Sequence, residues 1–170
     1  MRSRSIAVAL FLVWAALALP ASPQQTRAAK TSLLGRDDGL AVISSALDAH
    51  TRLASKTDCS HLVHAIYARA GFSYDYASSS DLYDGNVSFR RVKHPQPGDL
   101  IVWPGHVGIV VNPAQHSFYS ALTTGLGVDA YDSHYWKQRG KPRFLRYLKS
   151  ATQLSVTQTT RSEQLGTKDE

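Results

Sequence analysis

The sequence is poor in cysteine and in long apolar runs, and each shortage excludes a class of protein. Its 170 residues contain one cysteine, Cys59, so no disulfide can form within the chain and the fold must stand on its hydrophobic core. The apolar run from Ile6 to Leu19 has 14 residues, fewer than the roughly 20 that a membrane-spanning helix needs. The chain also lacks a dense stripe of lysine and arginine with interleaved aromatic residues, which argues against nucleic acid as a partner.

The apolar run near the N-terminus has the form of a secretory signal peptide. Arg2 and Arg4 precede it, and the small residues between Pro20 and Pro23 offer a cleavage site. We therefore predict a signal peptide over residues 1–21, with an uncleaved anchor as the alternative. The mature protein is expected to be secreted or periplasmic, associated with the cell wall, monomeric and without a membrane span.

Charge and hydrophobic content are those of a folded, mildly basic domain. Hydrophobic residues make up 43% of the chain and charged residues 19%, which suits a packed core rather than a disordered chain. The formal net charge is +6, and it stays positive without Arg2 and Arg4, a balance that suits an anionic partner such as a cell wall. The basic run from Arg90 to His94 is expected to be a solvated rim, with carboxylate binding as the alternative.

Apolar spacing predicts that the domain begins with helices. The first helix is expected to begin near Asp37 and to end near Ser55, with Leu40, Ile43 and Leu47 as its buried stripe. The second is expected from Cys59 up to Gly71, and a Ser-x-x-Asp spacing predicts a third over about 79–84.

The second half of the chain has the pattern of short strands separated by turns. Its β-branched and aromatic segments are separated by Pro-Gly and Asn-Pro turns. Helices followed by strands predict an α+β domain with an antiparallel sheet over residues 36–149, between a linker over 22–35 and a disordered tail over 150–170. The expected strands are about 99–103, 106–111, 116–122, 128–131 and 143–148, and a capped helical turn is expected over 132–136.

Cys59 stands at the predicted start of the second helix. Thr57 and Asp58 before it are residue types that cap helices, and unpaired N–H groups in the first turn favour an anion. Together with the helix dipole, these conditions lower the pKa of a thiol and make it a nucleophile. The alternative is that Cys59 is a small buried hydrophobic residue.

A nucleophilic thiol needs a base within hydrogen-bond reach, and His106 is the best candidate. It opens a predicted strand directly after a Pro-Gly turn, and pairing across that turn puts Trp103 opposite it. Such a histidine is either a satisfied structural residue or faces a site. His61 and His64 lie on the Cys59 helix, but further metal ligands are not evident, so we expect neither a metal nor a cofactor.

Three blocks of sequence carry a family resemblance through their order and spacing. They are residues 58–63 (DCSHLV), 96–103 (QPGDLIVW) and 106–111 (HVGIVV). In this combination the chain resembles the NlpC/P60 family of cell-wall cysteine peptidases over roughly residues 40–148. The resemblance implies a papain-like fold, in which a cysteine at a helix N-terminus packs on an antiparallel sheet.

The resemblance also implies roles for individual residues. Cys59 would be the nucleophile and His106 the base, while Asp58 and Ser60 would help to hold the free amino end of a peptidoglycan stem peptide. Further candidates for substrate binding are Trp103, Ser80 and Asp81.

The sequence departs from the family pattern in two places. His61 stands where a glycine usually follows the Asp-Cys-Ser motif. The third catalytic position, usually His, Asn or Gln, aligns with Ser120, whose hydroxyl accepts an imidazole N–H less strongly. His116 is not expected to replace it, because strand pairing puts residue 106 opposite 120 or 121 and His116 opposite residue 111.

The predicted function is hydrolysis of the D-glutamyl to diamino acid bond in peptidoglycan stem peptides. It would proceed through a Cys59 thioester with His106 as base and Ser120 as its orienting residue. One alternative is a CHAP-type amidase or another papain-like acyltransferase. The other is a non-catalytic relative that binds the cell wall, which the two departures at His61 and Ser120 support.

Overall fold

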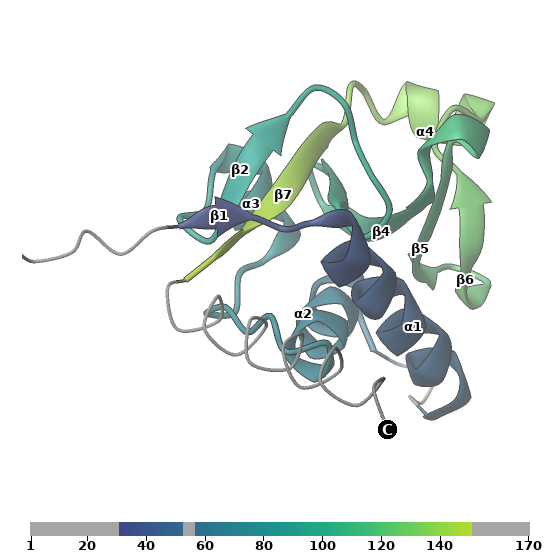
Figure 1. The fold of residues 1–170 in the computed structure, drawn as a ribbon. Coiled ribbons are helices and arrows are strands. Elements are labelled where there is room, and N and C mark those ends of the chain that lie inside the picture. Colours follow the sequence, from purple (N-terminus) through teal and green to yellow (C-terminus); the bar gives the residue numbers. More distant parts are fainter. Residues whose placement is uncertain (1–30, 53–56, 151–170) are drawn as a thin grey trace, which may run out of the picture.

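The computed structural model describes residues 31–52 and 57–150 (Figure 1). The predicted signal peptide, most of the predicted linker, the predicted end of the first helix near Ser55 and nearly all of the predicted tail lie outside these residues. None of the helices in the described part of the chain is long and apolar enough to cross a membrane.

The described residues form an α+β domain with one antiparallel sheet. Along the sheet the strands run in the order β1-β7-β3-β4-β5-β6, and β2 also pairs with β7. The strands are β1 (Ser32–Leu33), β2 (Phe89–Val92), β3 (Leu100–Trp103), β4 (His106–Asn112), β5 (Ser117–Leu122), β6 (Gly125–Ala130) and β7 (Arg143–Lys149). The helices are α1 (Arg36–Arg52), α2 (Cys59–Arg69), α3 (Ser79–Asp84) and α4 (His134–Gln138), with a 3-10 turn at Pro113–Gln115.

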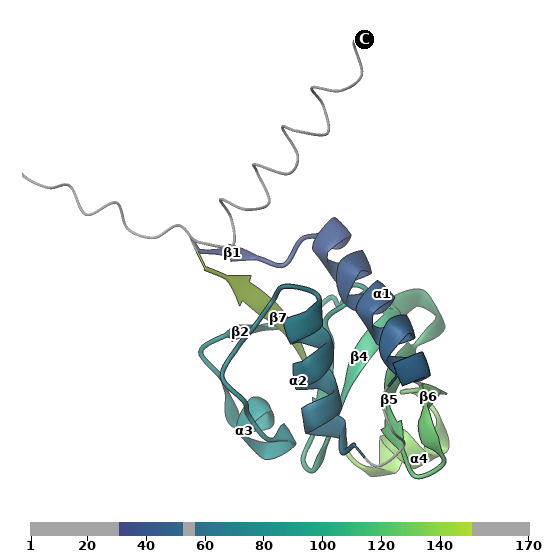
Figure 2. The same ribbon diagram turned by 90° about the horizontal axis from the view of Figure 1, so that it is seen from below.

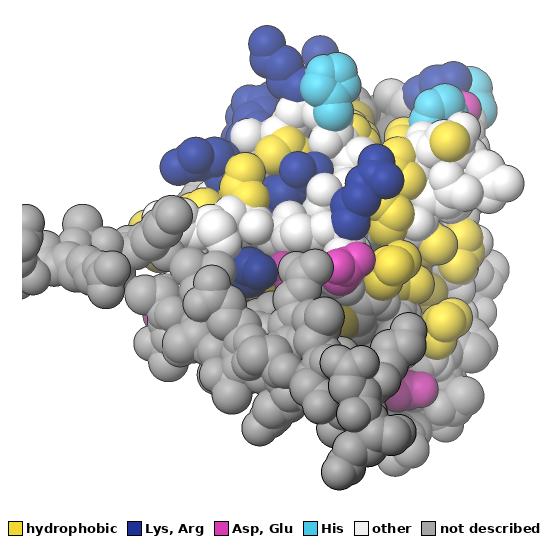
Figure 3. Space-filling view, in the orientation of Figure 1, with side chains coloured by type: hydrophobic (Ala, Val, Ile, Leu, Met, Phe, Trp, Pro, Cys, Tyr) yellow, Lys and Arg dark blue, Asp and Glu magenta, His cyan; other side chains and the backbone are white. Residues whose placement is uncertain are grey.

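Two of these strands differ from the sequence-based expectation. Residues 22–35 were expected to be a linker, yet β1 pairs with β7 and Leu34 beside it is buried at 2% exposure. The basic run was expected to be a solvated rim, and Arg90 and Arg91 are indeed exposed, but no strand was expected there, and most of the run lies in β2, which pairs with β7. Backbone pairing with a distant strand is not visible in local composition. Figure 3 shows lysine and arginine side chains gathered on the side of the molecule where β2 lies.

The buried stripe predicted for the first helix is wrong at Leu40 and Leu47, whereas Ile43 is partly buried against the larger core cluster. In α1 it is Val42 and Ala46 that are buried, while Leu40 and Leu47 are 58% and 66% exposed. The reason is the close approach of Gly39 to the turn before β3, where an added Cβ would lie 2.1 Å from the Pro97 carbonyl oxygen. Because Gly39 faces the turn, the residues three and seven positions after it, Val42 and Ala46, lie on the same side of the helix and face the core.

Helices α1 and α2 lie side by side on one face of the sheet (Figure 2). The buried face of α2, including Leu62 and Ile66, joins Val107 and Ile109 of β4 in the larger of two core clusters. Each such side chain stabilises the fold by about 1.5–3 kcal/mol through removal from water. The smaller cluster lies around α4 and contains Ile101, Trp103, Val110, Phe118 and Trp136. β4 therefore contributes to both cores, and its first residues lie between them.

The turn before β3 is fixed by a buried ion pair. Asp99 is fully buried, and its two oxygens accept hydrogen bonds from Nε and Nη2 of Arg146 at 2.9 and 2.8 Å. It also accepts the backbone N–H of Gln96. The β3–β4 hairpin then begins in a defined register, in which Trp103 pairs with His106 as predicted.

Candidate active site

Helix α2 begins at Cys59 because Asp58 caps it. The Oδ1 atom of Asp58 accepts the backbone N–H groups of Ser60 and His61, both at 2.9 Å, which confirms the predicted N-cap. The N–H of His61, together with the Ser60 hydroxyl and the His61 ring, lowers the pKa of Asp58 to about 2 although partial burial opposes it. The cap holds Cys59 at the first helical position, where its own N–H has no partner within the helix.

The Cys59 thiol is half-buried at the edge of the larger core. Burial raises its pKa, and the nearby charge of Asp58 acts in the same direction. The N–H groups of Val107, Cys59 and Ser60 lower it, but they do not outweigh burial. The first helical turn therefore lowers the pKa of this thiol as expected, but the expectation of a net lowered pKa is wrong for the free protein, because burial outweighs the turn. The resting sulfur carries its proton.

Ser120 fixes the tautomer of His106. The Ser120 hydroxyl is fully buried, donates to the carbonyl oxygen of Val107 at 2.7 Å and lies 3.1 Å from Nε2 of His106. A hydroxyl has one hydrogen, so Oγ accepts from His106 and Nε2 carries a proton. The lone pair of the neutral ring is then on Nδ1. Ser120 therefore reaches the imidazole, as predicted, but the predicted pairing of residue 106 with 120 or 121 is wrong, because Ile109 pairs with Tyr119 and this register sets Ser120 opposite Gly108.

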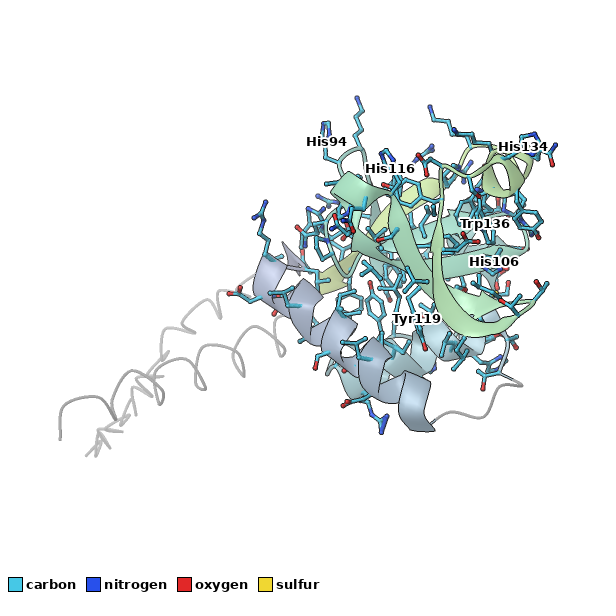
Figure 4. The ribbon with its side chains drawn as sticks, turned by 90° about the vertical axis from the view of Figure 1, so that its right-hand side faces the viewer. His94, His106, His116, Tyr119, His134 and Trp136 are labelled. Carbon is cyan, nitrogen blue, oxygen red and sulfur yellow. The ribbon has the colours of Figure 1, made fainter. Side chains whose placement is uncertain are left out.

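His106 is enclosed by aromatic rings and is 9% exposed. Its ring lies 4.7 Å from that of Trp136 and 6.2 Å from that of Trp103. Burial, followed by repulsion from the Arg139 guanidinium, lowers its pKa to about 4. The imidazole is therefore neutral at neutral pH. Figure 4 shows His106 beside Trp136.

One backbone group links the two candidate catalytic residues. The N–H of Val107 lies near enough to the Cys59 sulfur to lower the pKa of the thiol, and Val107 directly follows His106 in β4. The sulfur therefore lies at the start of the strand that carries the imidazole. Among residues 57–150 no hydrogen bond joins the two side chains directly, and the bond of the imidazole to Ser120 uses Nε2 rather than Nδ1.

A polar cluster surrounds the start of α2. The Ser60 hydroxyl donates to Asp58 at 2.8 Å and lies 3.1 Å from the Tyr76 hydroxyl. Nδ1 of His61 lies 2.6 Å from Oδ2 of Asp58, and its ring stacks on Tyr76 with centroids 4.4 Å apart. His61, the departure from the family pattern, is thus a partner of the carboxylate expected to bind substrate. Sequence reasoning missed Tyr76, because only its position sixteen residues after Ser60 in a folded loop gives it this contact.

The other residues considered in the sequence have structural contacts outside this cluster. Ser78 caps α3 and Asp81 completes the capping box, accepting the N–H and hydroxyl of Ser78 at 3.0 and 2.7 Å, while Ser80 is exposed beside it. Trp103 is fully buried, which puts it behind the imidazole rather than in contact with a substrate. His116 pairs with Asp132 at 3.0 Å beyond the end of β4.

Two further residues near the imidazole were not singled out by the sequence. The Trp136 ring packs against that of His106 at an angle of 38°, and the positive charge of Arg139 one turn later lowers the pKa of His106. The capped turn at residues 132–136 was expected, but packing of α4 over the start of β4 is a long-range contact with no local signal.

The comparison with protein families agrees with this geometry. The family model described as "NlpC/P60 family" matches residues 48–142, more than half of the chain. The matched segment includes Asp58, Cys59, His106 and Ser120. No curated protein sequence matches the chain.

Proposed function

Because the chain belongs to the NlpC/P60 family, whose members are generally hydrolytic cell-wall peptidases, we propose that it is a secreted cysteine peptidase of peptidoglycan. The proposed substrate is the amide bond from D-glutamate to a diamino acid in the stem peptide, and the proposed scaffold is papain-like. The cell wall is then the site of action.

The observation that carries the proposal is the tautomer of His106. Its Nε2–H is held by Ser120, which leaves Nδ1 as the only basic nitrogen of the ring. The Cys59 sulfur lies against the N–H of the next residue, Val107. Acyl transfer needs a nucleophile and a base close together. Here they are the half-buried thiol of Cys59 and the neutral imidazole of His106, both at the start of β4.

The proposed reaction begins from neutral partners. As the Cys59 sulfur attacks the amide carbon, its proton passes to Nδ1 of His106, so the imidazolium forms only during attack. The oxyanion that develops on the carbonyl oxygen accepts the N–H of Cys59 at the start of α2. His106 then protonates the leaving amine, and the C–N bond breaks to give a thioester and a free amine.

Hydrolysis of the thioester completes the cycle. His106, neutral again, takes a proton from water, whose oxygen forms the new bond to the acyl carbon. The C–S bond breaks, the sulfur regains a proton from the imidazolium, and the acid is released. Ser120 keeps the ring in one orientation through both halves.

The substrate amine is proposed to bind at the start of α2. Asp58 keeps its negative charge because its pKa is about 2, and Ser60 and Tyr76 offer hydroxyls next to it. An ammonium group there would share the carboxylate with His61, which already contacts Oδ2.

One observation favours a second candidate, the non-catalytic wall-binding protein. The pKa of Cys59 is raised rather than lowered, as expected for an unreactive thiol. Wall binding without turnover would then be the activity of the domain.

Mass spectrometry of peptidoglycan fragments separates these functions. Purified peptidoglycan is incubated with the mature protein and, as the control, with Cys59→Ala. The proposal predicts new fragments with a free amine on the diamino acid, produced by the native protein alone. A free amine elsewhere would indicate an amidase or another acyltransferase, and identical fragments from both proteins would leave the wall-binding function.

A further inference from the structure

A basic cavity of about 600 Å³ is formed by the end of β2, the start of β7 and the residues next to them. Its charged lining residues are Arg91, Lys93, Lys141 and Arg143, and no acidic residue of the described chain lines it. The basic run at residues 90–94, for which the sequence left a solvated rim or carboxylate binding open, thus contributes one side of a cavity.

The positive charge of this cavity is not compensated by neighbouring carboxylates. Residues 90–94 and 137–146 contain eight lysines and arginines and no aspartate or glutamate, and Figure 3 shows such side chains gathered where β2 lies. Among the described residues, none of the four cavity cations forms an ion pair. Three of them, Arg91, Lys93 and Lys141, are also exposed. Uncompensated like charges repel one another, so an anion bound between them is favoured.

Arg143 gives the cavity a charge that is fixed in place. Its Nη1 donates to the carbonyl oxygen of Tyr83, and its guanidinium carbon lies 3.8 Å from the centroid of the Tyr83 ring. A guanidinium held on an aromatic face stays where it is, whereas the three exposed cations have flexible side chains that can adjust to a ligand. The cavity therefore combines one fixed positive charge with three adjustable ones.

The cavity lacks the apolar groups that a membrane-binding surface uses. Surfaces that bind a bilayer combine cations with exposed hydrophobic side chains that enter the lipid. None of the large exposed hydrophobic side chains of the described residues lines this cavity. Its own apolar residues, Val92, Pro142 and Phe144, are only partly exposed. A hollow basic surface of this kind favours a polyanion in solution over a bilayer.

We propose that this cavity binds a linear polymer whose repeating charge is a phosphodiester. Three exposed cations around one cavity exceed the charge of a single carboxylate, and a polymer brings one charge with each repeat. The cations stand on two sides, Arg91 and Lys93 on the β2 side and Lys141 on the β7 side. A tetrahedral phosphodiester directs its two free oxygens to different sides of the polymer and can meet both, and lysine binds phosphate as a point charge.

The cavity lies at the same end of the sheet as the candidate catalytic residues. Arg143 pairs with Val102 of β3, and the next residue of β3, Trp103, pairs with His106 of β4. Two strand spacings therefore separate β7 from β4, which is about 10 Å. No residue at the start of α2 lines the cavity. A bound polymer thus holds the domain in place next to the candidate active site and leaves the start of α2 open, a binding function beyond the proposed hydrolysis.

Fluorescence anisotropy with the mature protein and a labelled synthetic glycerol phosphate oligomer measures this binding. If the three exposed cations are engaged, raising the salt from about 50 to about 200 mM should weaken binding about twentyfold, because each neutralised phosphate releases counterions. In the double variant Lys93→Gln, Lys141→Gln the same change in salt should weaken it only about threefold. Arg69→Gln, which removes one exposed charge at the far end of α2, should keep the twentyfold effect. An unchanged salt dependence in the double variant would overturn the site.

Three further ligands and one further variant test the ligand class in the same assay. A single glycerol phosphate should bind far more weakly than the oligomer, and an oligoglutamate of equal charge about fivefold more weakly, because its carboxylates are planar. Arg91→Lys should bind like the native protein, since phosphate needs the charge rather than the guanidinium fork. Equal affinity for the oligoglutamate or the single unit, or tighter binding to phosphatidylglycerol vesicles than to the oligomer, would overturn the assignment to a phosphodiester polymer.

Discussion

Ser120 accepts the Nε2–H of His106 because its own hydrogen is donated to a backbone carbonyl. The two bonds, 3.1 Å to the imidazole and 2.7 Å to the Val107 oxygen, make a small hydroxyl act as a one-way acceptor. A free hydroxyl would rotate and satisfy either tautomer. Serine is a weaker acceptor than an amide or a second imidazole, but its fixed orientation still selects one tautomer of His106.

Replacing Ser120 by alanine should release that tautomer. We expect kcat on peptidoglycan fragments to fall about tenfold, the effect of one lost hydrogen bond, while substrate binding changes little. The ¹⁵N shifts of the His106 ring should change from an Nε2–H pattern to a tautomer mixture. Ser117→Ala in the same strand is the control. Unchanged ring shifts in Ser120→Ala would contradict the orienting role.

The low pKa of His106 predicts how stability depends on pH. The folded protein holds this pKa at about 4, below the ordinary value of 6.5, so the unfolded chain binds the extra proton first. The neutral His106 costs no stability above pH 6.5. As the pH falls through 6.5 toward 4, this group lowers the free energy of unfolding by roughly 3 kcal/mol. Denaturant unfolding at a series of pH values measures the loss. His106→Gln should show a flatter profile, and an equal slope in both proteins would refute the assignment.

Local patterns in the sequence predicted those parts of the site that short-range geometry controls. The Pro-Gly turn fixes the pairing of Trp103 with His106, and the separate β4–β5 pairing brings Ser120 within hydrogen-bond reach of the imidazole. The N-cap at Asp58 and the Ser-x-x-Asp capping box of α3 are likewise local. In each case the residues that decide the structure are neighbours in sequence or across one hairpin.

What the sequence could not predict depends on contacts between distant segments. The pKa of Cys59 is set by how deeply the core covers it, and burial outweighs the helix N-terminus. The orientation of α1 is decided by Gly39 against a turn near residue 97, so Leu40 is exposed although its spacing suits a buried stripe. Trp136 and Arg139 reach the site only through the packing of α4.

The close contact at Gly39 gives a test of the packing of α1. An added Cβ at this position would lie 2.1 Å from the Pro97 carbonyl oxygen, and backbone on both sides limits relaxation. We expect Gly39→Ala to lower the free energy of unfolding by about 1–3 kcal/mol, despite the better helix propensity of alanine. Leu40→Ala, at an exposed position of the same helix, should have little effect. A stabilised Gly39→Ala protein, judged by denaturant unfolding, would show that α1 does not pack in this way.

Asp58 is expected to serve both the helix and the substrate, and two substitutions separate these roles. Asparagine keeps an oxygen that can accept the Ser60 and His61 N–H groups but has no charge, whereas alanine loses both. Asp58→Ala should therefore lower the free energy of unfolding by about 0.5–2 kcal/mol, and Asp58→Asn by much less.

Loss of the charge at Asp58 should instead appear in substrate binding. KM for a stem peptide with a free amino end should rise about tenfold in Asp58→Asn, because a charge-assisted bond to the ammonium becomes neutral. The same peptide with an acetylated amino end provides the control, since it has no ammonium to lose. If Asp58→Asn raises KM for both peptides equally, the carboxylate acts only through the helix and the pair that it forms with His61.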